Sequence, residues 1–172
     1  MRGYFLSIIA IGLLIVVGVS RADNLFRLGA GDTLRVTVFG EDDLSGTFSL
    51  DEGGRLAMPL LGPIFLEGLS LEEAEKKLTK HLREGWLRYP QVALEVTSHR
   101  PFYILGEVRS PGAYPWTIGL SVIGAVALGG GFTYRADEDD IDVQRPSKTF
   151  HDAALTRPVY PGDIIYVHQR FF

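Results

Sequence analysis

The chain has 172 residues, of which 46% are hydrophobic and 22% charged, so it can bury a substantial core and does not have the composition of a disordered protein. A formal net charge of −4 provides no basic footprint for nucleic acid, which argues against that class of partner. The sequence contains no Cys, which excludes disulfides, zinc–thiolate sites, thiol nucleophiles and lipid-modified cysteine.

Residues 1–22 have the pattern of a secretory signal peptide. Met1-Arg2 is a positive start, residues 4–19 are almost wholly apolar, and residues 20–22 place small side chains at −3 and −1 of a cleavage site after Ala22. The alternative is an uncleaved anchor, but an apolar run of about 16 residues is short for a membrane span of about 20. The pattern therefore favours a cleaved peptide and a secreted mature chain.

Short strands dominate the pattern that follows. Residues 33–39 alternate apolar and polar side chains, which predicts a half-buried strand. Residues 47–50 and 55–58 are expected to pair as a hairpin around the turn at 51–54. Further strands are expected over residues 91–97, 102–108, 113–116, 141–144 and 164–168.

Residues 70–85 predict an amphipathic helix of about four turns. Ser70 and Glu73 have the spacing of a capping box. The apolar stripe expected to face a sheet is Leu71, Ala74, Leu78 and Leu82. A second, apolar helix is expected over residues 121–128, and three glycines at 129–131 end it.

The predicted strands outnumber the helices, so the fold class is α+β and not an alternating βαβ chain. A break near residues 98–101 divides the mature sequence into two units of similar size. The dipeptide Gly-Asp occurs before a predicted strand in each unit, at residues 31–32 and 162–163.

Patterns of catalytic and metal-binding residues are weak. The histidines have no paired-ligand spacing and are interpreted as solvated or hydrogen-bonded; they are His81, His99, His151 and His168. Residues 29–31 resemble the start of a dinucleotide-binding loop but precede a strand, not a helix. The acidic segment 137–142 lacks the glycine and terminal Glu of an EF-hand and is interpreted as a solvated loop. No catalytic residue, cofactor or metal is therefore predicted.

Aromatic side chains are concentrated in the second half of the sequence. Aromatic rings stack on sugar faces and anchor subunit contacts, although core packing is the commoner role of any single one. The candidates for contact with a polymer or another subunit are Tyr103, Tyr114, Trp116, Phe132 and Tyr134.

Several segments resemble those of known protein domains. The segments similar to the polysaccharide biosynthesis/export domain are FRLGAGDTL (26–34), VFG (38–40), RLAMPLLG (55–62), GLSLEEA (68–74) and YPQV (89–92). The segments similar to a soluble-ligand-binding β-grasp (SLBB) domain are FYILGEV (102–108), PGAY (111–114), ALGGGFT (127–133) and PGD (161–163). In order and spacing, the chain resembles the outer-membrane polysaccharide export proteins.

The resemblance implies a mixed-sheet export domain over residues 23–98 and a β-grasp, ubiquitin-like SLBB domain over residues 99–172. It implies a non-enzymatic subunit of a capsule or exopolysaccharide export channel in the periplasm, associated with the outer membrane. Such subunits form rings of identical copies around the path of the polysaccharide. The implied partners are an inner-membrane co-polymerase and a separate outer-membrane β-barrel.

Nine motif residues are expected to shape this subunit, mostly as turn formers. They are Gly31, Asp32, Pro59, Gly62, Gly106, Pro111, Gly112, Gly162 and Asp163.

The sequence departs from the larger family members in three respects. Those members carry a lipidated Cys, which is absent here, and a C-terminal membrane helix, for which too few residues follow His168. Gly124 also stands where an acidic residue would complete a capping box with Ser121, so the second helix is expected to be less well capped.

Two other functions remain open at the level of sequence. The chain could be a monomeric carbohydrate-binding module, which would bind glycans tightly without assembling. It could also be a polysaccharide lyase or hydrolase, although the sequence singles out no pair of carboxylates for that chemistry.

Overall fold

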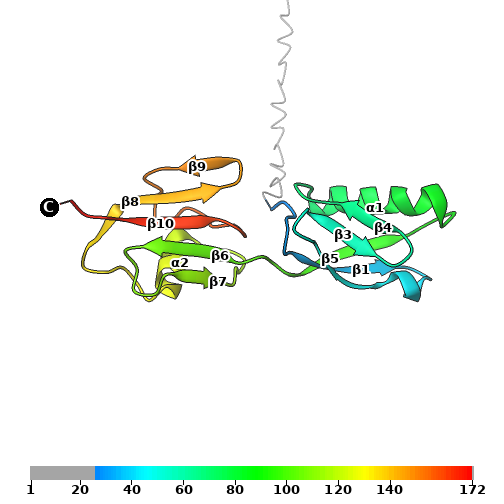
Figure 1. Ribbon diagram of the computed structural model, residues 1–172, viewed down its shortest axis with the longest axis horizontal. Coiled ribbons are helices and arrows are strands. Elements are labelled where there is room, and N and C mark those ends of the chain that lie inside the picture. Colours follow the sequence, from blue (N-terminus) through cyan, green and yellow to red (C-terminus); the bar gives the residue numbers. More distant parts are fainter. Residues whose placement is uncertain (1–25, 172) are drawn as a thin grey trace, which may run out of the picture.

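The computed structural model describes residues 26–171, so the predicted signal peptide lies outside the described residues. Two units lie side by side along the long axis and are joined through residues 98–101 (Figure 1). Each unit has its own hydrophobic core, the first built from residues 28–94 and the second from residues 102–167. The two cores fall on either side of the expected break, and the domain boundaries at residues 22 and 98 stay predictions.

The first unit contains two small sheets. The three-stranded sheet has the order β2-β1-β5, with both outer strands antiparallel to β1, and the two-stranded sheet is the hairpin β3–β4. The strands are β1 (Thr33–Val38), β2 (Gly46–Ser49), β3 (Arg55–Met58), β4 (Gly62–Phe65) and β5 (Val92–Ser98), with a 3-10 turn η1 (Asp42–Leu44) after β1.

The prediction that residues 47–50 and 55–58 pair with each other as a hairpin is wrong. β2 pairs with β1 and β3 pairs with β4, and a single bridge between Leu50 and Leu56 connects the two segments. The Asp51 carboxylate accepts hydrogen bonds from the backbone N–H groups of Gly53 and Arg55, each at 2.9 Å. These local hydrogen bonds stabilise the turn, through which the chain passes from the three-stranded sheet to the β3–β4 hairpin.

The helix α1 (Leu71–Gly85) forms as its capping box predicts. The Ser70 hydroxyl accepts from the Glu73 N–H at 3.2 Å, and the Glu73 carboxylate accepts from the Ser70 N–H at 2.7 Å. The buried side chains of α1 are Ala74, Leu78 and Leu82. They belong to the core of the first unit, where α1 packs against β5. Removing two leucines and an alanine from water stabilises the first unit by several kcal/mol, on the order of 2 kcal/mol for each leucine.

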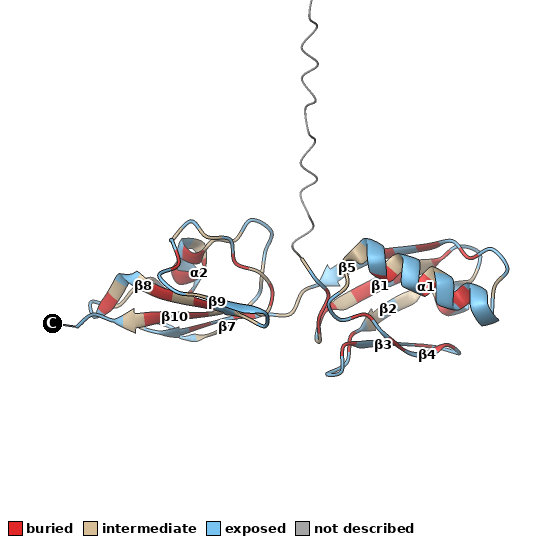
Figure 2. Ribbon diagram, turned by 90° about the horizontal axis from the view of Figure 1, so that it is seen from above, coloured by how far each residue is buried: buried red, intermediate tan, exposed pale blue. Residues whose placement is uncertain are grey.

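The second unit is a five-stranded mixed sheet with one helix on one face (Figure 2). The strand order is β7-β6-β10-β8-β9; β10 is parallel to β6, and the other pairs are antiparallel. The elements are β6 (Phe102–Gly106), β7 (Gly112–Tyr114), α2 (Val122–Leu128), β8 (Ala136–Arg145), β9 (Lys148–Phe150) and β10 (Ile164–Gln169). A mixed sheet that holds a single helix is the expected β-grasp arrangement, so the α+β fold class is confirmed.

The acidic segment 137–142 is a strand, which corrects its interpretation as a solvated loop. β8 begins at Ala136 and pairs with β10 on one side and β9 on the other. Ile141 and Val143 are fully buried beneath α2, and main-chain pairing and this burial outweigh the low strand propensity of Asp and Glu.

The N-terminus of the second helix, α2, has only one of the two hydrogen bonds of a capping box. The Ser121 hydroxyl accepts from the Gly124 N–H at a long 3.4 Å, and Gly124 has no side chain that could return a bond to Ser121. Neither helix within residues 26–171 has the length and apolarity required to span a membrane.

Candidate functional site

The Gly-Asp pair at residues 31–32 closes a tight turn at the start of β1. The Asp32 N–H donates to the Gly29 carbonyl at 3.1 Å, and the Asp32 carboxylate accepts from the Gly29 N–H at 2.8 Å. Gly31 has a φ of 88°, a conformation that glycine adopts without steric cost. The carboxylate thus fixes the entry into the strand.

The pair at residues 162–163 builds the same turn at the start of β10. The Asp163 N–H donates to the Tyr160 carbonyl at 3.1 Å, its carboxylate accepts from the Tyr160 N–H at 2.8 Å, and Gly162 has a φ of 84°. The recurrence of Gly-Asp in the sequence therefore corresponds to one local structure used once in each unit.

Both Asp side chains of these turns are fully buried and ion-paired. Asp32 accepts from the Arg100 backbone N–H at 2.9 Å and from Arg100 Nη1 at 2.7 Å. Asp163 accepts from Arg145 through Nε at 2.8 Å and Nη2 at 2.7 Å, and this bonding raises the pKa of Arg145 above its ordinary value. A buried carboxylate is strongly destabilising unless it is paired in this way.

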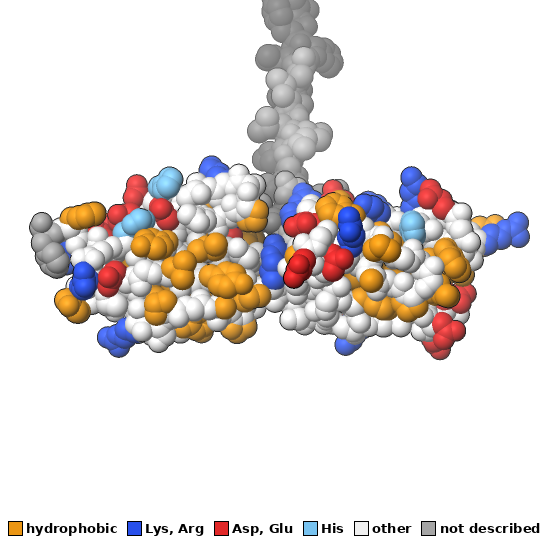
Figure 3. Space-filling view, in the orientation of Figure 1, with side chains coloured by type: hydrophobic (Ala, Val, Ile, Leu, Met, Phe, Trp, Pro, Cys, Tyr) orange, Lys and Arg blue, Asp and Glu red, His pale blue; other side chains and the backbone are white. Residues whose placement is uncertain are grey.

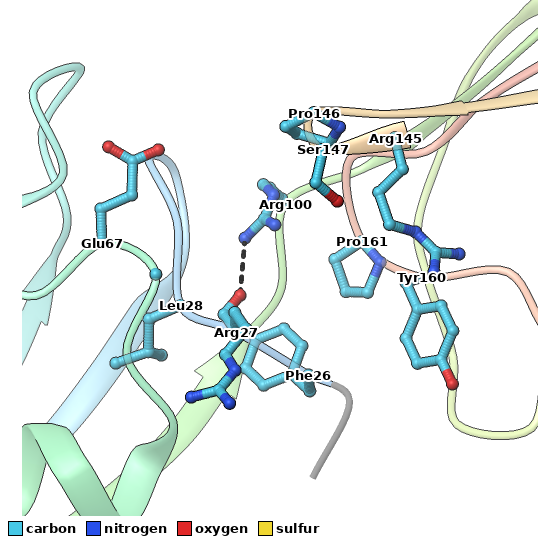
Figure 4. A pocket seen from close by; sticks show the side chains of 11 residues that line it. Phe26, Arg27, Leu28, Glu67, Arg100, Arg145, Pro146, Ser147, Tyr160 and Pro161 are labelled. Carbon is cyan, nitrogen blue, oxygen red and sulfur yellow. Dashed lines mark hydrogen bonds between the residues drawn. The ribbon is translucent and has the colours of Figure 1, made fainter. Parts of the chain in front are cut away.

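The Arg100 side chain lies between the two turns and connects the units. A Cβ atom at Gly29 would lie 2.5 Å from Arg100 Nη1, and one at Gly162 would lie 2.7 Å from Arg100 Nε. Arg100 also donates to the Arg27 carbonyl at 3.4 Å, which Figure 4 shows, and the Gly162 N–H donates to the Pro101 carbonyl at 3.0 Å. Both glycines leave room for the guanidinium group.

An aromatic stack crosses the same junction. The His99 ring makes edge-on contacts with Phe26 and Trp116, with centroids 4.6 and 4.7 Å apart. The Trp116 indole N–H donates to the Val159 carbonyl at 2.6 Å, which fixes that ring to the second unit. Burial lowers the pKa of His99, an effect that Asp32 opposes and Arg100 reinforces, so the environment between the aromatic rings favours the neutral imidazole.

A cavity of about 390 Å³ opens beside Arg100, between the two units (Figure 4). The arginines on its wall are each paired, Arg27 with Glu73, Arg100 with Asp32 and Arg145 with Asp163. Because their charges are compensated, the cavity does not have the character of an anion site. Its lining residues are Phe26, Arg27, Leu28, Glu67, Gly68, Arg100, Arg145, Pro146, Ser147, Tyr160 and Pro161.

Four of the nine expected motif residues meet at this junction: Gly31, Asp32, Gly162 and Asp163. The other five lie elsewhere. Pro59 and Gly62 lie at the β3–β4 turn, Pro111 and Gly112 lie where β7 begins, and Gly106 lies at the end of β6. Their roles in shaping the subunit stay predictions.

The five aromatic candidates do not form one surface. Trp116 lies in the junction, Tyr114 donates its hydroxyl to the Ser110 carbonyl, and Phe132 packs against the second core. Tyr103 and Tyr134 are exposed. All five contact roles remain predictions, and these two rings are the most accessible to a partner.

Sequence reasoning missed Arg100, Arg145 and His99 at the junction. Its one usable signal was the Gly-Asp recurrence, because a buried Asp requires a cation. Residues 26–171 contain one group of side chains that could hold a metal ion: Asp140, Asp142 and His168, on the second sheet.

Two family profiles match the chain in succession. The profile of the polysaccharide biosynthesis/export protein matches residues 20–97, and that of the SLBB domain matches residues 101–158. The profiles meet where the structure places the break between the two cores and where Arg100 joins the Gly-Asp turns.

Curated relatives agree with these matches. The chain is 33% identical over 130 residues to the exopolysaccharide production protein ExoF of Rhizobium meliloti, a match that covers 69% of this chain and 30% of that protein. It is 26% identical over 126 residues to the polysialic acid transport protein KpsD of Escherichia coli, covering 72% of this chain and 23% of that protein. The chain thus spans less than a third of the length of these relatives. On the two profiles, these relatives and the α+β fold, the chain belongs to the polysaccharide biosynthesis/export protein family.

Proposed function

We propose that this protein is a subunit of a capsule or exopolysaccharide export channel in the periplasm, associated with the outer membrane. Copies of the chain form a ring around the path of the polymer. Family membership supports transport of polysaccharide as the general role, because the names of two relatives refer to exopolysaccharide production and polysialic acid transport.

The observation that carries the ring proposal is the connected junction. A head-to-tail contact closes into a ring only if every subunit repeats the same rotation, so a freely hinged subunit is a poor building block. Three contacts act across the two units: the ion pair of Arg100 with Asp32, the close fit of Arg100 against Gly162, and the edge-on contact of His99 with Trp116. These contacts hold one angle between the units.

Transport through such a ring requires a polar conduit and no bond breaking. The two fully buried acids within residues 26–171, Asp32 and Asp163, are each bonded to an arginine and a backbone N–H. Carboxylates held in this way have a structural role, because they are enclosed and their oxygens are hydrogen-bonded within the fold. We infer that the subunit is non-enzymatic, receives polymer from an inner-membrane co-polymerase and delivers it to an outer-membrane β-barrel.

Native mass spectrometry of the processed protein tests the ring. We expect one closed oligomer of fixed copy number for the wild type and a spread of sizes for Arg100→Ala, because the junction then loses its central cation. Arg35→Ala is the matched control, since Arg35 pairs with Glu95 on the exposed surface of the first unit. A wild-type chain that is strictly monomeric at high concentration contradicts the proposal.

A monomeric carbohydrate-binding module is the second candidate. One observation favours it: Tyr103, Leu105 and Tyr166 are exposed on adjacent strands β6 and β10, where hydrophobic side chains gather on the face of the second unit shown in Figure 3. Aromatic rings on a bare sheet can stack on sugars. Tight binding to a glycan array by a monomer would select this candidate over the ring.

A further inference from the structure

Two carboxylates and two imidazoles lie together on the sheet face of the second unit that α2 does not cover. Asp140 and Asp142 are two residues apart on β8, so their side chains share one face of the strand. On the neighbouring strand Tyr166 pairs with Asp142, and the register shifts at His168, which reaches back toward both carboxylates. His151, after β9, contacts Asp142 from the other side.

We propose that this cluster binds a divalent transition-metal ion of the Zn²⁺ class, with Asp140, Asp142 and His168 as ligands. One ligand atom from each lies within 4.8 Å of the other two. His168 Nε2 is 3.2 Å from Asp142 Oδ2 and 3.8 Å from Asp140 Oδ1. Ligands about 2.05 Å from a tetrahedral zinc ion are separated by about 3.3 Å, so small side-chain rotations complete the site.

Hydrogen bonding alone does not account for the position of Asp140. The distances of 2.8 Å from His151 Nδ1 and 3.2 Å from His168 Nε2 to Asp142 are those of hydrogen bonds. The distance of 3.8 Å from His168 to Asp140 is too long for one. A second carboxylate beside the His–Asp pair repels Asp142 unless a cation, either the protonated His168 or a metal ion, lies between them.

The ligand set selects the kind of ion. Ca²⁺ and Mg²⁺ prefer oxygen ligands alone, whereas imidazole nitrogen favours zinc, copper or nickel. His151, bonded to the second oxygen of Asp142, orients that carboxylate as an outer partner of the metal. The site would connect β8 to β10 and to the segment after β9.

Titration of the untagged, chelator-treated full chain with ZnCl₂ in a calorimeter tests the site. We expect one ion bound per chain with micromolar or tighter affinity. Asp140→Asn should weaken binding at least tenfold while leaving the His–Asp hydrogen bonds intact. His168→Gln should weaken binding at least tenfold as well, but it also removes the hydrogen bond between His168 and Asp142. Asp139→Asn is the matched control, because it removes the same charge from the adjacent residue of β8 outside the ligand set.

Three results overturn the inference. One is the absence of binding at millimolar Zn²⁺, and another is unchanged affinity in Asp140→Asn. The third is an equal loss in Asp139→Asn and Asp140→Asn, which would indicate general attraction to acidic residues. Circular dichroism without metal checks that each variant is folded. If His168→Gln is not folded, the two Asp variants decide, because the Asp140 side chain is 42% exposed and should tolerate the change to Asn. The assay uses no polysaccharide, so its outcome is independent of the proposed function.

Discussion

Among Gly→Ala substitutions at the turns of the second unit, Gly106→Ala should be the most destabilising. Gly106 has a φ of 83°, and a Cβ atom there would overlap the Val167 backbone carbonyl on β10. That carbonyl accepts a hydrogen bond from the Glu107 N–H at 2.9 Å. The methyl group therefore has no space unless β6 and β10 separate where they pair in parallel.

The magnitude follows from two contributions. A left-handed backbone costs an alanine about 1–2 kcal/mol relative to glycine. Displacing the carbonyl of Val167 sacrifices a buried hydrogen bond, about 1 kcal/mol, and adds the strain of moving a strand, about 1 kcal/mol more. The expected loss is about 3–4 kcal/mol, a large part of the stability of a small domain.

The matched control is Gly131→Ala. Gly131 has nearly the same φ, 88°, but a Cβ atom there meets nothing within 4 Å. Only the backbone cost should appear, about 1–2 kcal/mol. The difference between the two variants isolates the steric contribution.

Tryptophan fluorescence during urea unfolding can report each unit separately. The chain has two tryptophans, Trp86 after α1 in the first unit and Trp116 bonded to Val159 in the second. In a Trp86→Phe background, Gly106→Ala should lower the urea midpoint by about 1.5–2 M, for a slope of about 2 kcal/mol per M. Losses within about 0.5 kcal/mol of each other in the two glycine variants would refute the steric argument.

Three further predictions concern the junction and the first helix. Arg100→Ala leaves the buried Asp32 carboxylate without its cation, so the free energy of unfolding should fall by about 3–5 kcal/mol in urea titrations. Arg35→Ala, which removes an exposed pair, should cost about 0–1 kcal/mol. Burial lowers the pKa of His99 below its ordinary 6.5, so as the pH falls the imidazole is protonated in the unfolded chain before it is protonated in the folded one. Stability should therefore fall as the pH falls below about 6.5. His99→Phe should flatten this decline in thermal melts across about pH 5 to 8. Ser70→Ala removes the helix cap and should cost about 1 kcal/mol in the Trp86 transition while leaving the Trp116 transition unchanged; equal shifts in both would contradict a local effect.

Local patterns in the sequence predicted the elements that depend on neighbouring residues. The capping box of Ser70 and Glu73 and the apolar stripe behind it specify α1 within one continuous segment, and the Gly-Asp pairs specify two turns of four residues each. Alternation of apolar residues likewise located β1, β5 and β10.

The contacts that connect distant segments were not predictable in this way. Arg100 and Asp32 are 68 positions apart, and nothing in the sequence distinguishes Arg100 from the other basic residues as the partner of a buried acid. The acidic strand β8 depends on pairing with β10, which follows it by about twenty residues and supplies its own buried side chains. The His–Asp cluster escaped notice for the same reason, because its members come from two paired strands and a loop and not from one short motif.

Deletion of the gene in the source organism, followed by measurement of polysaccharide at the cell surface, tests the central claim most directly. The account predicts that surface polymer is lost on deletion, accumulates inside the cell envelope, and returns when the wild-type chain or Arg35→Ala is supplied. Surface polymer that is unchanged by the deletion would contradict the account.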